Sequence, residues 1–245
     1  MKNFIILLKM DVIRLIKSKS SIFYLFIYPI LLIMLLGYLT SSTYQQGFTS
    51  YDYYGITIIT FFILGSSIVS LQAVKEEKNK KANTRILSII DNSTSFLLSK
   101  IISVFLLVIF FSLITILLTV ILFGVNFGNI TQVMIILLPF IFFSSTIGVT
   151  LGILFKNEEL IKQLLNLFIN ISAILGGTFF SIGALSVLDE VSIISPLKWM
   201  NLVLFQMIFD NNFSLYYLIL IVNTILSIIF IIISALKLKR EKVLY

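Results

Sequence analysis

Six long stretches without a charged residue constrain this chain more than any other feature of its sequence. They cover residues 22–39, 53–74, 101–123, 133–155, 163–182 and 213–236. The hydrocarbon core of a bilayer is about 30 Å thick, and a helix needs about 20 apolar residues to cross it. A helix also pairs its backbone groups internally, as lipid requires. The pattern therefore predicts an all-α integral membrane protein, one transmembrane domain over residues 1–245 with six transmembrane helices, the fifth over about 160–182.

Basic residues fall almost entirely on one set of linkers between these stretches. Of the 18 Lys and Arg residues, 17 lie before the first stretch, between the second and third, around the turn between the fourth and fifth, or after the sixth. Only Lys198 lies on the other set, which is net acidic. The positive-inside rule therefore predicts a plasma-membrane protein with both termini in the cytoplasm. The net charge of +7 indicates topology and contact with anionic membrane lipids, not nucleic-acid binding.

The composition excludes several classes of membrane enzyme and carrier. The chain has no histidine and no cysteine, which zinc and rhomboid-type proteases, haem proteins and thiol redox carriers need. It has no phosphate-binding G-x-x-x-x-G-K-S/T loop, so a partner must bind ATP if ATP is used. The six stretches also lack the ionisable residue that proton- or sodium-coupled carriers bury near the midplane. We expect no catalytic residue, no metal site and no cofactor bound directly.

Residues 1–20 predict an amphipathic interfacial helix before the first span. At 100° per residue, one arc of about 120° holds Phe4, Ile5, Leu8, Val12, Leu15 and Ile16. Asp11 and Arg14 lie outside that arc. We expect this helix to lie along the inner membrane surface.

The longest basic linker, residues 75–100, holds the segment best suited to contact a soluble partner. It opens with a charge run that includes Glu76 and Glu77 and is equally well explained as a solvated extension of the second span. Residues 84–91 predict a two-turn helix. Its apolar face is formed by Ile86, Ile89 and Ile90. This face either enters a pocket on a partner or lies on lipid headgroups, and periodicity leaves both interpretations open.

Polar and small side chains recur along one side of the fifth stretch. They are Gln163, Asn166, Asn170, Ala173 and Gly177. Amides inside a membrane either join helices, here at a dimer seam, or line a substrate path. Both interpretations stay open.

The fourth stretch carries Gly148 and Gly152 in a G-x-x-x-G pattern. Small residues at this spacing allow two helix backbones to approach closely. We predict a tight helix contact at this point.

Together these features resemble the permease subunit of type 2 (ABC-2) ATP-binding-cassette exporters over nearly the whole chain. The first cytoplasmic loop of that family runs from acidic residues through a glycine, a threonine and a leucine-rich turn to a proline and a closing lysine. This chain follows that order to Lys100, with Asn83 in place of the glycine and Asp91-Asn92 in place of the proline. The resemblance implies a cytoplasmic coupling helix over 84–91 that enters a cleft on an ATPase subunit. The implied coupling residues are Glu76, Glu77, Thr84, Arg85, Ile86, Leu87, Ile89, Ile90 and Asp91.

The resemblance also covers the region between the fifth and sixth stretches. In the family, a glycine-aromatic segment there leads into short helices that re-enter the outer leaflet. Independently, residues 197–209 are mostly apolar but too few to span a bilayer. The implied outer re-entrant residues are Phe179, Phe180, Pro196 and Trp199, with Trp199 as an anchor at the headgroups.

The resemblance further implies the partners and the mechanism. The partners are two copies of an ATPase subunit that bind ATP and Mg, and a second permease, either an identical copy or a related chain. ATP binding would close the ATPases, pull on the coupling helices and alter a cavity between the two halves. A neutral, aromatic-rich wall suits export of an amphipathic or hydrophobic substrate such as a peptide, antibiotic or drug. Abundant Ile, Lys and Asn are typical of an AT-rich bacterial genome.

Two alternatives remain open from the residues. The chain is also compatible with an ATPase-independent immunity or sensor protein that binds a toxic peptide in the membrane. A membrane enzyme that works through Ser, Asp or Glu is less favoured, because no paired base and nucleophile is evident in the stretches.

Overall fold

The computed structural model describes residues 2–44, 48–78, 93–180 and 190–243. These residues form helices joined by turns, without a strand. Their order is α1 (Lys2–Lys17), α2 (Lys19–Ile22), the π-helical turn η1 (Phe23–Ile27), α3 (Tyr28–Leu39), the 3-10 turn η2 (Ser41–Thr43), α4 (Ser50–Lys78), α6 (Ser93–Phe123), α7 (Ile130–Leu154), α8 (Glu158–Leu175), α10 (Pro196–Phe209) and α11 (Tyr216–Val243). The predicted all-α class is confirmed for this part of the chain.

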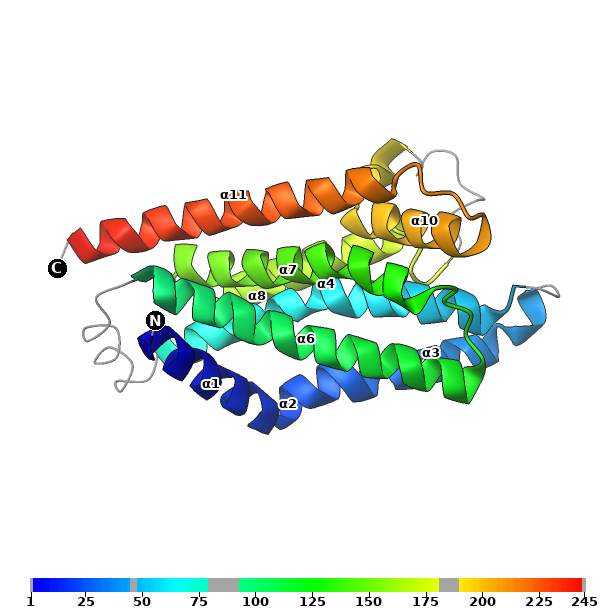
Figure 1. Cartoon of the computed structure of the whole chain (residues 1–245), viewed down its shortest axis with the longest axis horizontal. Helices are drawn as coiled ribbons and strands as arrows, with labels where there is room; N and C mark the ends of the chain where they lie inside the picture. Colours follow the sequence, from blue (N-terminus) through cyan, green and yellow to red (C-terminus); the bar gives the residue numbers. More distant parts are fainter. Residues whose placement is uncertain (1, 45–47, 79–92, 181–189, 244–245) are drawn as a thin grey trace.

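The long helices lie side by side along the long axis of the molecule, and both termini lie at the same end (Figure 1). We call this the terminal end. The opposite end, where α10 lies, is the distal end.

Five helical stretches in the described residues are long and apolar enough to cross a membrane. They are Lys19–Leu39, Ser50–Lys75, Thr94–Phe123, Ile130–Leu154 and Tyr216–Leu238. Five of the six predicted spans therefore have a matching helix.

The remaining predicted span, 160–182, corresponds to α8, which differs from the other five. It has 18 residues, and three of its first five are charged. It also ends at Leu175, earlier than predicted, where Gly176 forms the C-cap. Gly177 then takes a φ of +63°, the left-handed conformation that glycine adopts without strain and that ends many helices.

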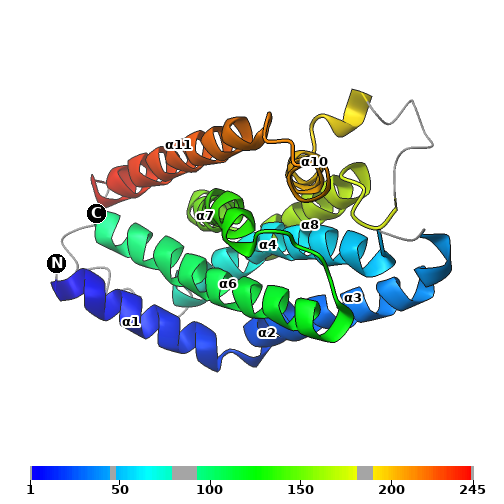
Figure 2. The ribbon, with the colours of Figure 1, turned by 45° about the vertical axis from the view of Figure 1, so that its right-hand side comes forward.

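Helix α4 lies at the centre of the bundle, between α3, α6, α7 and α8 (Figure 2). Every residue from 52 to 71 in this helix is buried. Small and hydroxyl side chains allow this burial, because they let neighbouring backbones come close. Their hydroxyl groups donate hydrogen bonds to backbone carbonyls of the same helix. Ser66 and Ser144 illustrate this between α4 and α7, with their hydroxyl oxygens 3.0 Å apart.

The predicted tight helix contact lies between α7 and α4. A methyl group added at Gly148 would overlap the carbonyl oxygen of Ser67 and lie 2.7 Å from the Cβ of Ser70. At Gly152 the nearest atom would be the Cβ of Val74, at 3.1 Å. The prediction from G-x-x-x-G is confirmed, with Gly148 as the closest point.

Candidate functional site

A buried ion pair joins α1 to α6. Asp11 is 3% exposed and Lys100 is 1% exposed. The Nζ of Lys100 lies 2.5 Å from the Oδ1 of Asp11. At this distance and burial the two charges neutralise each other, which is what allows them inside the protein.

This pair corrects the predicted orientation of the N-terminal helix. Asp11 lies on the buried side of α1 with Leu15, whereas Ile5 and Ile16 of the predicted apolar arc are 60% and 50% exposed. The physical reason is that Lys100 compensates the Asp11 charge, so the stripe that packs on α6 includes a carboxylate. Periodicity placed Asp11 just outside the predicted apolar arc, because a carboxylate is counted as polar whatever its partner.

The pair also corrects the expectation that the spans are free of ionisable residues. Lys100 lies inside Thr94–Phe123, which is one of the five candidate spans. It is six residues from the start of that stretch, about 9 Å along the helix axis, and so lies far from its middle. The chain therefore has a buried charge in a spanning helix, but not at the midplane position that ion-coupled carriers use.

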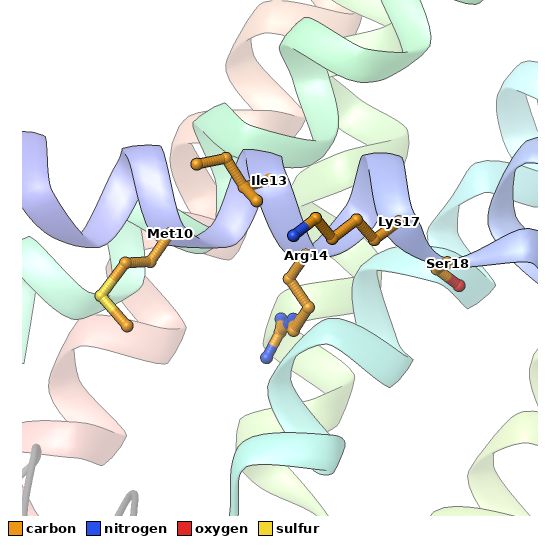
Figure 3. A pocket seen from close by; sticks show the side chains of 5 residues that line it. All are labelled: Met10, Ile13, Arg14, Lys17 and Ser18. Carbon is orange, nitrogen blue, oxygen red and sulfur yellow. The ribbon is translucent and has the colours of Figure 1, made fainter.

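Two other basic side chains donate hydrogen bonds to backbone carbonyls near the ends of α4 and α7. Arg14 extends from α1 toward α4 (Figure 3), where its Nη2 donates to the carbonyl of Ala73 at 3.0 Å. The same nitrogen lies 3.8 Å from the Oδ1 of Asp11. Lys75 donates to the carbonyls of Phe155 and Lys156 at the end of α7. We call Asp11, Arg14, Lys75 and Lys100 the basal brace, because together they tie α1, α4, α6 and the end of α7.

The basal brace contacts both helix ends that flank the linker with the predicted coupling segment. We call these helix ends, the end of α4 and the start of α6, the stems of the linker. Helix α4 continues to Lys78 and α6 begins at Ser93, so the start of the charge run is a helical extension of the second span. Glu76 and Glu77 lie in that extension, but their side chains are outside the described residues. The segment from Thr84 to Asp91 is also outside them, and its coupling role stays a prediction.

The residues of the polar stripe predicted on the fifth span differ in their exposure to solvent. Gln163 and Asn170 are exposed, Asn166 is half-buried, and Ala173 is fully buried. Gly177 lies beyond the end of α8, so the stripe does not continue to it along a helix. The exposed amides face away from the described chain, and their role at a dimer seam or along a pathway stays a prediction.

At the distal end, four consecutive carbonyls after α8 each accept a hydrogen bond from a side chain. Asn201 of α10 donates to Gly176 at 3.0 Å. Three side chains of α4 supply the others: Tyr53 donates to Gly177, Thr57 to Thr178 at 3.0 Å, and Tyr54 to Phe179 at 3.1 Å. We call these four side chains the distal latch. The latch is needed because the chain leaves the helical hydrogen-bond pattern at Gly176, and buried carbonyls must find other partners.

The distal latch places the residues predicted for the outer segment. Phe179 packs on Phe61 with ring centroids 5.5 Å apart, while Phe180 is 76% exposed. Pro196 occupies the first turn of α10. Trp199 is half-buried, and its Nε1 donates to the carbonyl of Ile193 at 2.8 Å.

Aromatic rings fill the space between the distal latch and the loop before α4. Phe48 lies 4.8 Å from Phe209 between ring centroids, and Tyr53 lies 5.5 Å from Phe205. Tyr44 packs beside Tyr53 at 5.8 Å. Burial, reinforced by the neighbouring phenol of Tyr54, raises the pKa of Tyr44 to about 12.

Replacing Asn201 with leucine tests the distal latch. Asn201 is 3% exposed, and it also accepts a hydrogen bond from Thr60 at 2.6 Å. The change leaves the carbonyl of Gly176 buried without its donor, at an expected cost of about 1–3 kcal/mol in unfolding free energy. Thermal unfolding in detergent measures the loss. Asn170→Leu, at an exposed amide, is the control and should change stability by less than about 0.5 kcal/mol. Equal stability of the two variants would contradict a structural role for the latch.

Comparison with known families decides which group of proteins this architecture represents. Residues 40–236 match the family model described as ABC-2 family transporter protein. The chain belongs to the ABC-2 transporter family. It is therefore a multi-pass membrane subunit of an ABC transporter, and membership implies association with an ABC ATPase subunit. None of the curated proteins compared with this sequence matches it.

The matched region of this ABC-2 permease contains part of the basal brace and all of the distal latch. Lys75 and Lys100 lie within residues 40–236, whereas Asp11 and Arg14 precede them. Sequence reasoning missed both groups of contacts. For the basal brace, the available signal was a carboxylate, Asp11, on the same helical stripe as Leu8 and Leu15. For the distal latch, it was the sequence Gly176-Gly177-Thr178 at the end of a predicted helix.

Proposed function

We propose that this permease exports an amphipathic or hydrophobic substrate and that a separate ATPase supplies the energy. The observation that carries the proposal is the basal brace within an ABC-2 family member. It fixes both stems of the linker on which the predicted coupling helix lies. A pull on this linker would therefore move α1, α4 and α6 together, and not only bend a loop.

The orientation follows from charge. The termini and the turn between α7 and α8 lie at the terminal end, and 17 of the 18 basic residues belong to the linkers of that end. The positive-inside rule supports a cytoplasmic terminal end, where a soluble ATPase is available. The distal end, with α10 and the latch, would then face outward.

In this orientation α8 would be the sixth membrane element and α10 the re-entrant one. Helix α8 is 18 residues long, within the range that crosses a bilayer, and its charged residues lie in its first turns at the terminal end. Helix α10 has 14 residues, too few to cross. Anchored to α4 by the latch, α10 would close the outer side of the path.

The outward surface of α8 supports a neutral or amphipathic substrate. Residues 163–175 carry no charge. Apolar side chains such as Leu164 and Leu167 are 53% and 57% exposed beside the amides of Gln163 and Asn170. Such a surface suits either a path for peptides or drugs or a seam with a second permease, and in a dimer of permeases both uses would meet at α8.

Co-purification tests the coupling role directly. A tagged permease is expressed together with an ABC ATPase subunit from the same genome, and the retained ATPase is quantified. Changing Ile86, Leu87 and Ile90 to Asp removes the apolar face of the predicted coupling helix. The retained ATPase is expected to fall by about 30-fold, the effect of losing an interface hot spot of about 2 kcal/mol.

Ser42→Asp, at an exposed residue of the distal end, is the matched control and should retain the ATPase. An undiminished ATPase signal in the triple variant would refute the coupling role. Absence of any ATPase from the wild-type preparation would refute the exporter proposal and favour the ATPase-independent alternative.

A further inference from the structure

A cavity lined by both polar and apolar side chains lies between the N-terminal segment and α8 near the terminal end. It has a volume of about 190 Å³, and α4 forms its third wall. Its polar lining consists of Ser20, Ser21, Tyr24, Gln72, Lys162 and Asn166. We call this cavity the donor pocket. It is distinct from both the basal brace and the distal latch.

Hydrogen-bonding groups and one positive charge line the donor pocket. Each of its six polar side chains carries at least one N–H or O–H donor, and all except Lys162 also carry an acceptor oxygen. The hydroxyl of Ser21 already donates to Ser18, so five side chains keep a donor for a ligand. Lys162 is the charged side chain among the described residues that line it, and no carboxylate accompanies it. The cavity therefore offers positive charge and converging donors to a ligand that supplies acceptor oxygens.

Several side chains of the donor pocket make no hydrogen bond or ion pair within the described part of the chain. The side chains of Gln72, Lys162 and Asn166 are half-buried, and among the described residues none of them has a hydrogen-bond or ion-pair partner. Their hydrogen-bonding groups are therefore available within one cavity, where a ligand with several acceptor oxygens can contact all three.

A phosphate group fits this donor set better than a carboxylate does. It has three strong acceptor oxygens, against two in a carboxylate, and lysine binds phosphate well as a point charge. Exposed apolar side chains on the same elements, Phe23 at 50% and Ile27 at 41%, offer surface to an acyl chain. Basic pockets between membrane helices on the cytoplasmic side are known to suit anionic lipid headgroups.

We propose that the donor pocket binds the phosphate of an anionic phospholipid in the leaflet around the terminal end. The lipid would join the first span to α8 across a gap that side chains do not bridge. Lipid binding at this pocket does not depend on the substrate or on the ATPase. It can therefore be tested separately from the proposed export function.

The test is native mass spectrometry of the full-length chain in detergent, titrated with phosphatidylglycerol. The double variant Gln72→Leu and Asn166→Leu removes two donors without changing the charge, and it is expected to weaken lipid binding about tenfold. Lys162→Gln should weaken it by at least as much, whereas Lys162→Arg should retain most of the binding because it keeps the charge. Melting temperatures of all variants identify any that do not fold.

Matched controls lie on the same helix and at the adjacent turn. Gln163→Leu removes an exposed amide next to the pocket, and Lys156→Gln removes an exposed charge near it. Both should bind phosphatidylglycerol within a few-fold of wild type, because a lysine near the membrane contributes only about 1 kcal/mol of general attraction. Equal binding by wild type and the double variant would overturn the proposal.

Two further outcomes would also overturn it. Inorganic phosphate that binds to the chain and is not displaced by phosphatidylglycerol would make this a site for free phosphate. Pocket variants that lower the dimer fraction in the same spectra, with lipid binding unchanged, would make the surface an interface between two copies of the chain.

Discussion

Replacing Lys100 with methionine is expected to destabilise the permease by about 3 kcal/mol, because the buried carboxylate of Asp11 loses its close contact with the ammonium and keeps only Arg14, at 3.8 Å. Asp11→Leu should cost a similar amount, because the buried ammonium of Lys100 loses its carboxylate partner. Both groups are almost inaccessible to water, at 3% and 1% exposure, so solvent cannot replace the lost partner. Unfolding in detergent, followed by heat or denaturant, measures both losses.

The double variant Asp11→Leu with Lys100→Met tests whether the destabilisation comes from a broken ion pair or from any substitution at these two positions. Apolar residues of similar volume often replace a buried pair at no cost or with a gain of about 1–4 kcal/mol. The double variant should therefore be more stable than either single variant. Lys156→Met, at an exposed side chain, controls for loss of one positive charge and should be neutral. A Lys100→Met protein as stable as wild type would show that the pair contributes nothing to stability.

Gly148→Ala is expected to have the second large effect, about 3 kcal/mol of destabilisation, because the added methyl group has no space. It would overlap a backbone oxygen of Ser67, which cannot rotate away as a side chain could. Helices α4 and α7 would have to separate at their closest contact. Loss of monodisperse protein and a lower melting temperature are the measurements.

Gly152→Ala provides a control one turn further along the same helix. Its nearest neighbour would be the Cβ of Val74 at 3.1 Å, which needs a shift of only a few tenths of an ångström. Alanine also favours the helix over glycine by about 1 kcal/mol, so this variant should be close to neutral. Equal losses in the two variants would contradict the assignment of Gly148 as the closest contact.

Most of the fold could be predicted because lipid imposes simple rules on sequence. An uncharged stretch of sufficient length indicates a spanning helix, and five of the six stretches have one. The ends of these helices were harder to predict. A charged residue interrupts an uncharged stretch of sequence, but it does not have to end a helix. The third predicted span begins at residue 101, whereas α6 begins at Ser93 and its apolar stretch at Thr94. Lys100 is tolerated within that stretch because Asp11 neutralises it.

The side-chain contacts of the candidate site could not be predicted, because they join distant parts of the chain. Lys100 and Asp11 are separated by 89 residues, and Tyr53 and Gly177 by 124. Helical periodicity describes one helix at a time and does not show which neighbour it meets. The G-x-x-x-G pattern of α7 was informative because it requires close approach whatever the partner helix is.

The ion pair also sets an order for assembly during synthesis. Asp11 leaves the ribosome 89 residues before Lys100, which at about 5–20 residues per second is a delay of about 5–20 s. During that interval Asp11 has Arg14 of the same helix as its partner, and the surface of α6 on which α1 packs has not yet been made. The first two spans therefore leave the ribosome before α1 can complete its packing, and the arrival of α6 completes this part of the bundle.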